Sequence, residues 1–187
     1  AANGGLLSAA DLADYRTTHL PPLMGTYRGH QIATNRPPGG GIMVLQILNT
    51  LEAFDLSAMG HNSAEYIRVI AEAMKRATSD KDNFVGDPNF VDVPVDRLTS
   101  KIYGQELAAA IQRGEVAHVE RLQGPKESRN TTHVCVVDGA GNAVSMTHSL
   151  GMPSGAITDG LGFMYNGCMS VFDPRPGRAA SIAPGKG

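Results

Sequence analysis

The sequence has no tryptophan and only two cysteines, and aromatic residues make up 5% of its 187 positions. Cys135 and Cys168 are too few to build a disulfide framework, and their neighbours lack the spacing of a metal-binding cluster. We therefore expect no bound metal. With so few cysteines, the cellular compartment stays open.

An excess of positive charge is also absent. Lysines and arginines number 16 and are mixed with 18 aspartates and glutamates, which gives a formal net charge of −2. Nucleic acids and anionic membranes are bound by basic surfaces, so neither is expected as a partner. The longest strongly apolar run, Gly41 to Leu48, is interrupted by Gln46 and is far too short to span a membrane.

What is present suits a globular core, because hydrophobic residues make up 42% of the chain and charged residues 18%. A chain of this length has room for one domain. It starts at Ala1 without a methionine and ends in the turn-forming pair Pro184-Gly185, so we expect it to be a segment of a longer chain.

The first two-thirds of the chain has mainly helical patterns. Ser8 and Asp11 have the spacing of a capping box that opens a short helix ending at Tyr15. Further elements are predicted as a β segment with a turn over residues 26–34 and as helices over residues 42–54, from Asn62 or Ser63 onward, and over residues 100–112. The helix that follows Asn62 is amphipathic. Its predicted buried face comprises Tyr66, Ile70, Ala73, Met74 and Ala77, with Glu65, Arg68, Glu72 and Arg76 pointing elsewhere.

The character of the chain changes after residue 130. Residues 115–130 are polar and lack periodicity, which is typical of an exposed linker. Residues 131–137 and 143–150 are rich in β-formers and are separated by the turn-forming run 138–142, so a hairpin is predicted. A short strand is expected near residues 163–165.

Thr131 opens the predicted hairpin, directly after the linker. A threonine hydroxyl becomes a useful nucleophile when a base takes its proton, and the α-amine of an N-terminal threonine can be that base. Such an amine has an unperturbed pKa of about 7.7–8.0, close to working pH. This chemistry requires a backbone cut between Asn130 and Thr131. By itself, a threonine pair that begins a strand is more often a matter of β-propensity.

The run from Thr131 to Asp138, followed by residues 141–145, resembles the stretch that opens the small subunit of γ-glutamyltranspeptidases. Similar segments lie on both sides, in the order of that family, and cover nearly the whole chain. They are Gly4-Gly5-Leu6-Leu7-Ser8, Pro37-Pro38-Gly39-Gly40-Gly41, Glu72-Ala73-Met74-Lys75 with Asp80, Gly86-Asp87-Pro88-Asn89-Phe90-Val91, then Asn166, Met169 and Phe172, and Pro184-Gly185-Lys186.

The resemblance implies an α+β fold, part of an αββα N-terminal-nucleophile hydrolase, made as a precursor that cleaves itself between Asn130 and Thr131. Residues 1–130 would be the mostly helical C-terminal part of the large subunit, ending in the linker. Residues 131–187 would begin the small subunit with the nucleophile hairpin. Thr131 would form an acyl-enzyme with a γ-glutamyl or related acyl amide, which water or an amino-acid or peptide acceptor resolves. Ser149 stands where the family has a second threonine that hydrogen-bonds the nucleophile.

The same resemblance implies partners and a departure from the family pattern. The remaining segments of both subunits would complete the site, and no cofactor is implied, because an amine, a hydroxyl and backbone donors suffice for acyl transfer. Gly151 replaces a usual asparagine, Cys168 a glutamine or glutamate, and Val171 the aspartate that binds the substrate ammonium. Asp173 could take over that last role only if the backbone shifts. A buried ammonium without a carboxylate is costly, so we expect an acyl group that lacks it, as in related cephalosporin acylases.

Other interpretations stay open at this point. The lost polar residues are also compatible with a catalytically silent homologue that acts as a structural or binding module. His133 and His148 could face each other across the hairpin and hold a metal, although solvent-facing strand histidines are the default. Cys135 alternates with valines and is predicted as a small core residue, whereas Cys168, next to Gly167, is a candidate pocket residue.

Overall fold

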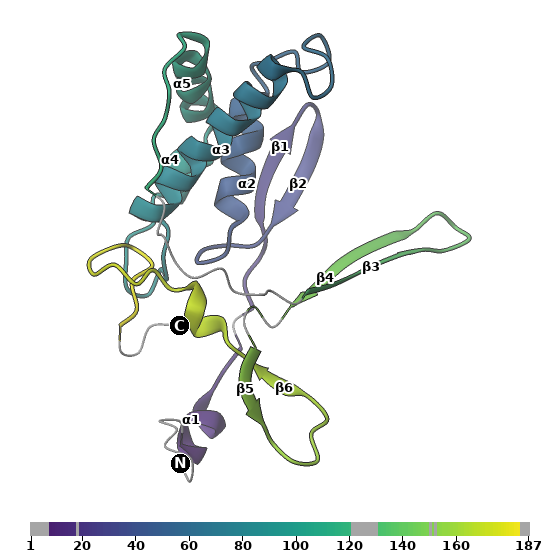
Figure 1. Ribbon diagram of the computed structural model, residues 1–187, viewed down its shortest axis with the longest axis vertical. Coiled ribbons are helices and arrows are strands. Elements are labelled where there is room, and N and C mark those ends of the chain that lie inside the picture. The colour runs from purple at the N-terminus through teal and green to yellow at the C-terminus, as the bar shows by residue number, and fades with distance from the viewer. Residues whose placement is uncertain (1–7, 18, 121–130, 150, 152, 184–187) are drawn as a thin grey trace.

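The computed structural model describes residues 8–17, 19–120, 131–149, 151 and 153–183. Figure 1 shows a helical body, a long hairpin that extends away from it, and a smaller C-terminal part below. The elements are α1 (Ala9–Asp14), β1 (Leu23–Tyr27), β2 (His30–Thr34), α2 (Gly41–Leu51), α3 (Ala64–Phe84), α4 (Val95–Leu98), α5 (Lys101–Gln112), β3 (Thr131–Val137), β4 (Ala143–Ser149), β5 (Pro153–Ile157), β6 (Met164–Asn166) and the 3-10 helix η1 (Cys168–Val171). The predicted α+β class is confirmed.

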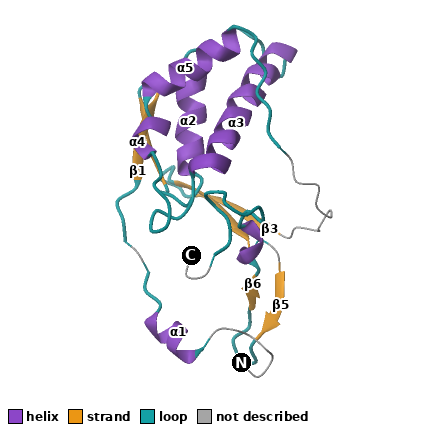
Figure 2. Cartoon of the chain, turned by 90° about the vertical axis from the view of Figure 1, so that its left-hand side faces the viewer, coloured by secondary structure: helices purple, strands orange, loops and turns teal. Residues whose placement is uncertain are grey.

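Helix α2 forms the centre of the body because it is apolar almost all round. It lies between α5 and α3 (Figure 2) and buries Ile42 and Leu45 together with three polar residues, Gln46, Asn49 and Thr50. One core cluster joins α2, α3 and α5, and a second joins α2 to β1 and α4. Burial of apolar surface of this kind is the main stabilising contribution to the fold.

The interpretation of α3 is confirmed in its N-cap and corrected in its buried face. Ser63, not Asn62, is the N-cap, because its hydroxyl accepts a hydrogen bond from the amide of Tyr66 at 3.1 Å. Met74 was expected on the buried face but is 52% exposed, and Glu72 was expected to point away but is only 4% exposed. The buried stripe is therefore rotated, since the segment after α5 covers the side of α3 that carries Glu72.

Both predicted N-terminal features are confirmed. Ser8 and Asp11 form the capping box of α1. The β segment is a hairpin, β1 with β2, turning at Arg28 and Gly29, which both have positive φ (47° and 84°). Two positive φ values in succession are the signature of the turn that matches strand twist. The hairpin packs on α2, where Gly25 comes so close to Leu45 that a Cβ there would be 2.5 Å from a leucine methyl.

The C-terminal part contains two further antiparallel pairs, β3 with β4 and β5 with β6. The β3–β4 hairpin has the predicted bounds to within one residue, and β6 lies at the expected short strand. Helix α4 and strand β5 were not predicted. Residues 173–181 form a loop that returns to the body, where a Cβ on Gly86 would lie 2.1 Å from the carbonyl oxygen of Ala179. Among the described helices, none is long and apolar enough to cross a membrane.

Candidate active site

Thr131 and Ser149 face each other at the open end of the β3–β4 hairpin. They are partners in the register of the two strands, and their hydroxyl oxygens lie 3.0 Å apart, within hydrogen-bonding distance. Ser149 also accepts a hydrogen bond from the amide of Gly151 at 3.1 Å. The candidate nucleophile and its predicted hydroxyl partner are therefore in contact, and β-sheet pairing holds both.

The turn at the far end of the hairpin sets this register. The side chain of Asp138 accepts hydrogen bonds from Asn142, through its side chain at 2.7 Å and its amide at 2.9 Å, and from the amide of Ala140 at 2.9 Å. These bonds, led by the Asn142 side chain, lower the pKa of Asp138. Gly141 supplies the positive φ of 83° that the turn requires. A one-residue slip would move Thr131 to the other face and separate it from Ser149.

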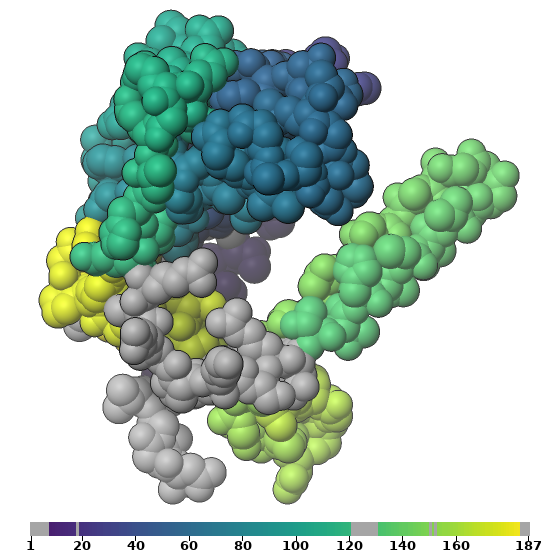
Figure 3. Space-filling model, turned by 45° about the horizontal axis from the view of Figure 1, so that its top comes forward, coloured from purple at the N-terminus to yellow at the C-terminus, as the bar shows by residue number. Residues whose placement is uncertain are grey.

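The two faces of the hairpin differ in polarity. Thr131 shares its face with His133, Cys135, Ser145 and Thr147, and His133 bonds Thr147 at 2.8 Å and Ser145 at 3.1 Å through its two ring nitrogens. The opposite face carries Val134, Val136, Val144 and Met146. All four of these side chains are exposed, and the hairpin stands clear of the body in Figure 3.

Two interpretations of this hairpin are wrong. His133 pairs with Thr147, and His148 pairs with Thr132, so the two histidines lie on opposite faces and cannot share a metal. No group of three metal-ligating side chains occurs among the residues that the structure describes. Cys135 is an exposed thiol on the polar face, 3.3 Å from His133, and is not a core residue here.

Gly151 leads from the hydroxyl pair toward the C-terminal part. Its φ is +67°, a conformation that glycine and asparagine tolerate better than other residues, which suits the asparagine usual at this position in the resembled family. A Cβ built on Gly151 would lie 3.8 Å from the sulfur of Cys168. Hydrogen bonds therefore link Thr131 to Ser149 and Ser149 to Gly151, and a side chain at position 151 would reach the sulfur of Cys168.

Cys168 and Val171, both candidate substrate-binding residues, border one cavity of about 890 Å3. Its walls are mainly apolar. They contain residues that precede residue 130 in the sequence and residues that follow it. Lining residues are Tyr15, Pro38, Gly39, Lys81, Val85, Gly86 and Asp87 before that point, and Asn166, Cys168, Met169, Val171, Phe172 and Ala180 after it. The loop of residues 37–41 and the 3-10 helix η1 thus meet at one cavity.

Asp173 does not line this cavity. Its carboxylate binds Arg175 through Nη2 at 2.6 Å and Nε at 2.9 Å, and it also accepts from the Arg175 amide at 2.9 Å. The Arg175 guanidinium accordingly lowers the pKa of Asp173 to about 2. Because the carboxylate of Asp173 is paired with Arg175, it is poorly placed to replace the carboxylate that is missing where Val171 stands. Asn130, the other side of the proposed cut, lies outside the described residues.

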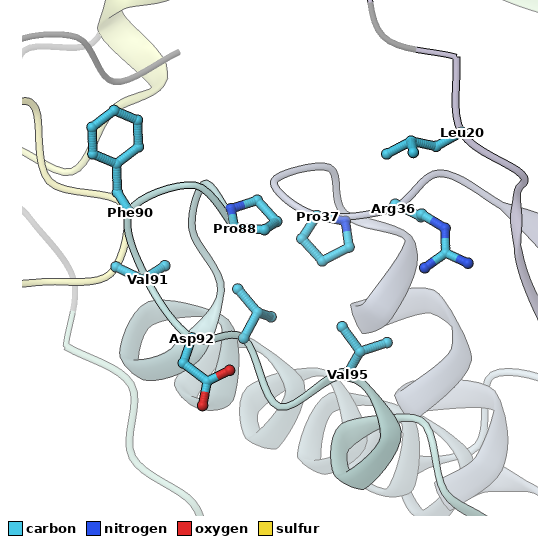
Figure 4. Close-up of a pocket in the computed structure, with 9 residues that line it drawn as sticks. Leu20, Arg36, Pro37, Pro88, Phe90, Val91, Asp92 and Val95 are labelled. Carbon is cyan, nitrogen blue, oxygen red and sulfur yellow. The ribbon is translucent and has the colours of Figure 1, made fainter.

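A separate cleft of about 560 Å3 lies beside the start of the loop of residues 37–41 (Figure 4). Pro37 and Pro88 line it, with Arg36 and Asp92 among its charged residues. It contains none of the candidate site residues. Of the two cavities, the 890 Å3 one is therefore the one bordered by candidate substrate-binding residues, Cys168 and Val171.

The fold is shared with two solved structures, a cephalosporin acylase and a γ-glutamyltranspeptidase. The structure is similar to that of a cephalosporin acylase from Bacillus halodurans, with a TM-score of 0.74 and 28% identity over 99% of this chain and 33% of the other. It is also similar to the γ-glutamyltranspeptidase of Helicobacter pylori, with a TM-score of 0.57 and 42% identity over 58% of this chain and 32% of the other.

The profile of the gamma-glutamyltranspeptidase family matches residues 1–186, and the chain belongs to that family. The acylase ACY 1 proenzyme of Pseudomonas sp. (strain SE83) is 43% identical over 189 residues, which span all of this chain and 34% of the relative. The glutathione hydrolase proenzyme of Escherichia coli (strain K12) is 39% identical over 182 residues, 94% of this chain and 31% of the relative. The chain thus spans about a third of these curated relatives.

Proposed function

We propose that the protein containing this chain is a self-processing amidohydrolase or acyltransferase that uses Thr131 as an N-terminal nucleophile. The observation that carries the proposal is the contact between the Thr131 and Ser149 hydroxyls at the start of a strand, directly after residue 130. The family match and the proenzyme names of the relatives support it. Residues 1–130 and 131–187 would then belong to different subunits.

The first step makes the nucleophile. The Thr131 hydroxyl oxygen attacks the carbonyl carbon of Asn130, the C–N bond breaks, and the acyl group moves to oxygen as an ester. Water then hydrolyses the ester and leaves a free α-amine on Thr131 and a new carboxylate on Asn130. This amine is the base that the hydroxyl needs for the reactions that follow.

In the mature protein the same oxygen attacks an amide substrate. The Thr131 amine accepts the hydroxyl proton and returns it to the departing amine, and an acyl-enzyme ester forms. Water or the amine of an amino acid or peptide then attacks the ester, which gives hydrolysis or transfer. Ser149 stabilises the reacting geometry, since its oxygen lies 3.0 Å from that of Thr131.

Denaturing gel electrophoresis of the full-length protein tests this proposal. We expect two bands, with the smaller chain beginning Thr-Thr-His, and a single band for Thr131→Ala. Ser149→Ala, which removes the contacting hydroxyl, should slow cleavage, and Ser149→Thr should preserve it. A wild-type protein that is folded and stays as one band would instead favour the silent module.

A second candidate concerns the acyl group. We infer that the substrate is an acyl amide without an α-ammonium, as in an acylase. Val171 and Cys168 border an apolar cavity, and Asp173 is held by Arg175, so none of them offers the ammonium a free carboxylate. Asp87 also lines the cavity, so the inference concerns the position of Val171, where an ammonium without a carboxylate partner would be destabilised.

Steady-state kinetics with glutaryl and γ-glutamyl anilides compare the two substrates. We expect a higher kcat/KM for the glutaryl compound, and Val171→Asp should shift the preference toward the γ-glutamyl one. A strong γ-glutamyl preference of the unmodified enzyme would rule out the acylase interpretation while leaving the nucleophile in place.

A further inference from the structure

The loop formed by residues 173–181 supports one wall of the acyl cavity. Phe172 and Ala180 line the cavity at the two ends of this loop, together with Val85 and Gly86, which follow α3. The loop is braced internally, since the amide of Asp173 donates to the carbonyl of Ala180 at 2.9 Å. Because a Cβ on Gly86 would lie 2.1 Å from the Ala179 carbonyl oxygen, the loop and the body are in close contact.

A group of charged and polar side chains ties this loop to α3 and to the segment after α5. We call it the Arg175 cluster, and its members are Asp82, Asn83, Glu120, Asp173, Arg175 and Arg178. Arg175 binds Asp173 at 2.6 Å, Glu120 at 3.1 Å and Asp82 at 3.4 Å. Arg178 donates to the Asn83 side chain at 2.7 Å and reaches Glu120 at 3.4 Å.

The position of the cluster in the sequence gives it a further consequence. Asp82, Asn83 and Glu120 precede residue 130, whereas Arg175 and Arg178 follow it. A backbone cut between Asn130 and Thr131 would place the two sides on separate chains. After such a cut, these non-covalent contacts would hold the loop of one chain against α3 of the other. Figure 3 shows the loop (yellow) lying against the segment that follows α5.

The strength of the cluster comes from its inner members. Glu120 is 68% exposed, and an ion pair with such a group contributes little. The side chains of Asp173, Asp82 and Arg175 are only 10%, 20% and 23% exposed, and Arg175 binds Asp173 through Nε and Nη2 and reaches Asp82 through Nη2. Arginine suits this role because its planar fork holds several acceptors in fixed directions.

We infer that Arg175 is a positioning residue for acyl-group binding, which holds the 173–181 loop against α3 and so keeps the cavity closed on that side after the chain is cut. This inference rests on the proposed function. Its specific content is that a residue outside the cavity lining controls substrate affinity through the loop, while the Thr131–Ser149 pair that performs the chemistry is untouched.

Kinetics of Arg175→Met in the full-length, processed protein test this inference. With the glutaryl anilide we expect KM to rise about tenfold and kcat to stay within about twofold, the signature of lost ground-state binding. Arg175→Lys should recover part of the affinity, because it keeps the charge but not the fork. Arg113→Met is the matched control, since Arg113 pairs with its neighbour Glu115 on the surface at 2.7 Å.

Hydrogen exchange of residues 173–181 gives a readout that does not depend on turnover. We expect these amides to exchange about tenfold faster in Arg175→Met, because the amides of Asp173 and Ser181 are protected by bonds within the held loop. If Arg175→Met fails to fold, the same measurements are made on Asp82→Asn, which leaves the Asp173–Arg175 pair intact. Unchanged KM and unchanged exchange in a folded variant would overturn the inference, whereas absence of the Thr-Thr-His chain would overturn the proposed function.

Discussion

At the scale of single residues, Glu72 is a buried carboxylate in the helical body. Its side chain is 6% exposed, yet it is ionised, because it binds Lys75 and Arg76 and accepts the amide of Ala117 at 2.8 Å. Burial opposes ionisation, but these hydrogen bonds outweigh it and lower the pKa of Glu72 to about 2. Glu72 therefore fastens the segment leaving α5 onto α3, at the start of the path toward the proposed cut.

Glu72→Gln should reduce the free energy of unfolding by about 1–3 kcal/mol, because two cations and the half-buried amide of Ala117 lose their charged acceptor. Urea unfolding followed by circular dichroism measures this. Glu65→Gln is the control, since Glu65 lies on the same helix but its pair with Arg68 is exposed. Equal effects of the two substitutions would contradict the role assigned to Glu72.

At the scale of elements, the helical body depends on how closely α2 and α5 approach. Gly104 of α5 faces Asn49 of α2, and a Cβ on Gly104 would lie 2.7 Å from the Asn49 Cβ and 2.9 Å from its carbonyl carbon. The Asn49 side chain in turn donates to the carbonyl of Thr99 at 2.8 Å, just before α5 begins. A glycine inside the helix here permits the close approach of α2 and α5, which share a core cluster.

Gly104→Ala should destabilise the protein by about 1–2 kcal/mol, even though alanine is the better helix former by about 1 kcal/mol. The added methyl meets backbone atoms of Asn49 that cannot move without separating the helices. Thermal unfolding compares it with Gln105→Ala, an exposed change at the next position of α5. A stabilised Gly104→Ala protein would show that the helices can separate at little cost.

At the scale of the whole molecule, carboxylates hold segments that are distant in sequence. Glu72 binds the segment after α5, and Asp173 belongs to the cluster that binds the 173–181 loop to α3. Both have a folded-state pKa of about 2, below their ordinary values of 4.5 and 3.8. A carboxylate with a depressed folded-state pKa stabilises the fold above its ordinary pKa, and this contribution is lost as pH falls toward the depressed value.

Stability should therefore fall as pH is lowered from about 4.5 to about 2, over the window between ordinary and folded-state pKa values. Unfolding free energies measured across this range by urea titration should decline less steeply in Glu72→Gln than in the unmodified protein. A variant with an unchanged slope would mean that other groups cause the acid sensitivity.

Local patterns predicted much of the fold and the centre of the site. The Ser8 capping box, the turn at Gly29, and the hairpin that brings Thr131 opposite Ser149 all depend on residues close in sequence, whose preferences are readable from the chain. The wrong predictions concern residues whose burial depends on segments that are distant in sequence. Burial of Glu72 and exposure of Met74 depend on which side of α3 the residues after α5 cover, and helical periodicity does not contain that information.

The sequence by itself determined the family. It also determined the helical first part and the placement of a threonine at the start of a strand with a serine in register, because hydrogen-bonded turns and side-chain periodicity act over a few residues. Only the tertiary structure decided that Cys168 and Val171 share a mainly apolar cavity with the end of α3, and that Asp173 forms a salt bridge with Arg175. Those contacts join residues far apart in the chain, and they arise from packing that no local preference specifies.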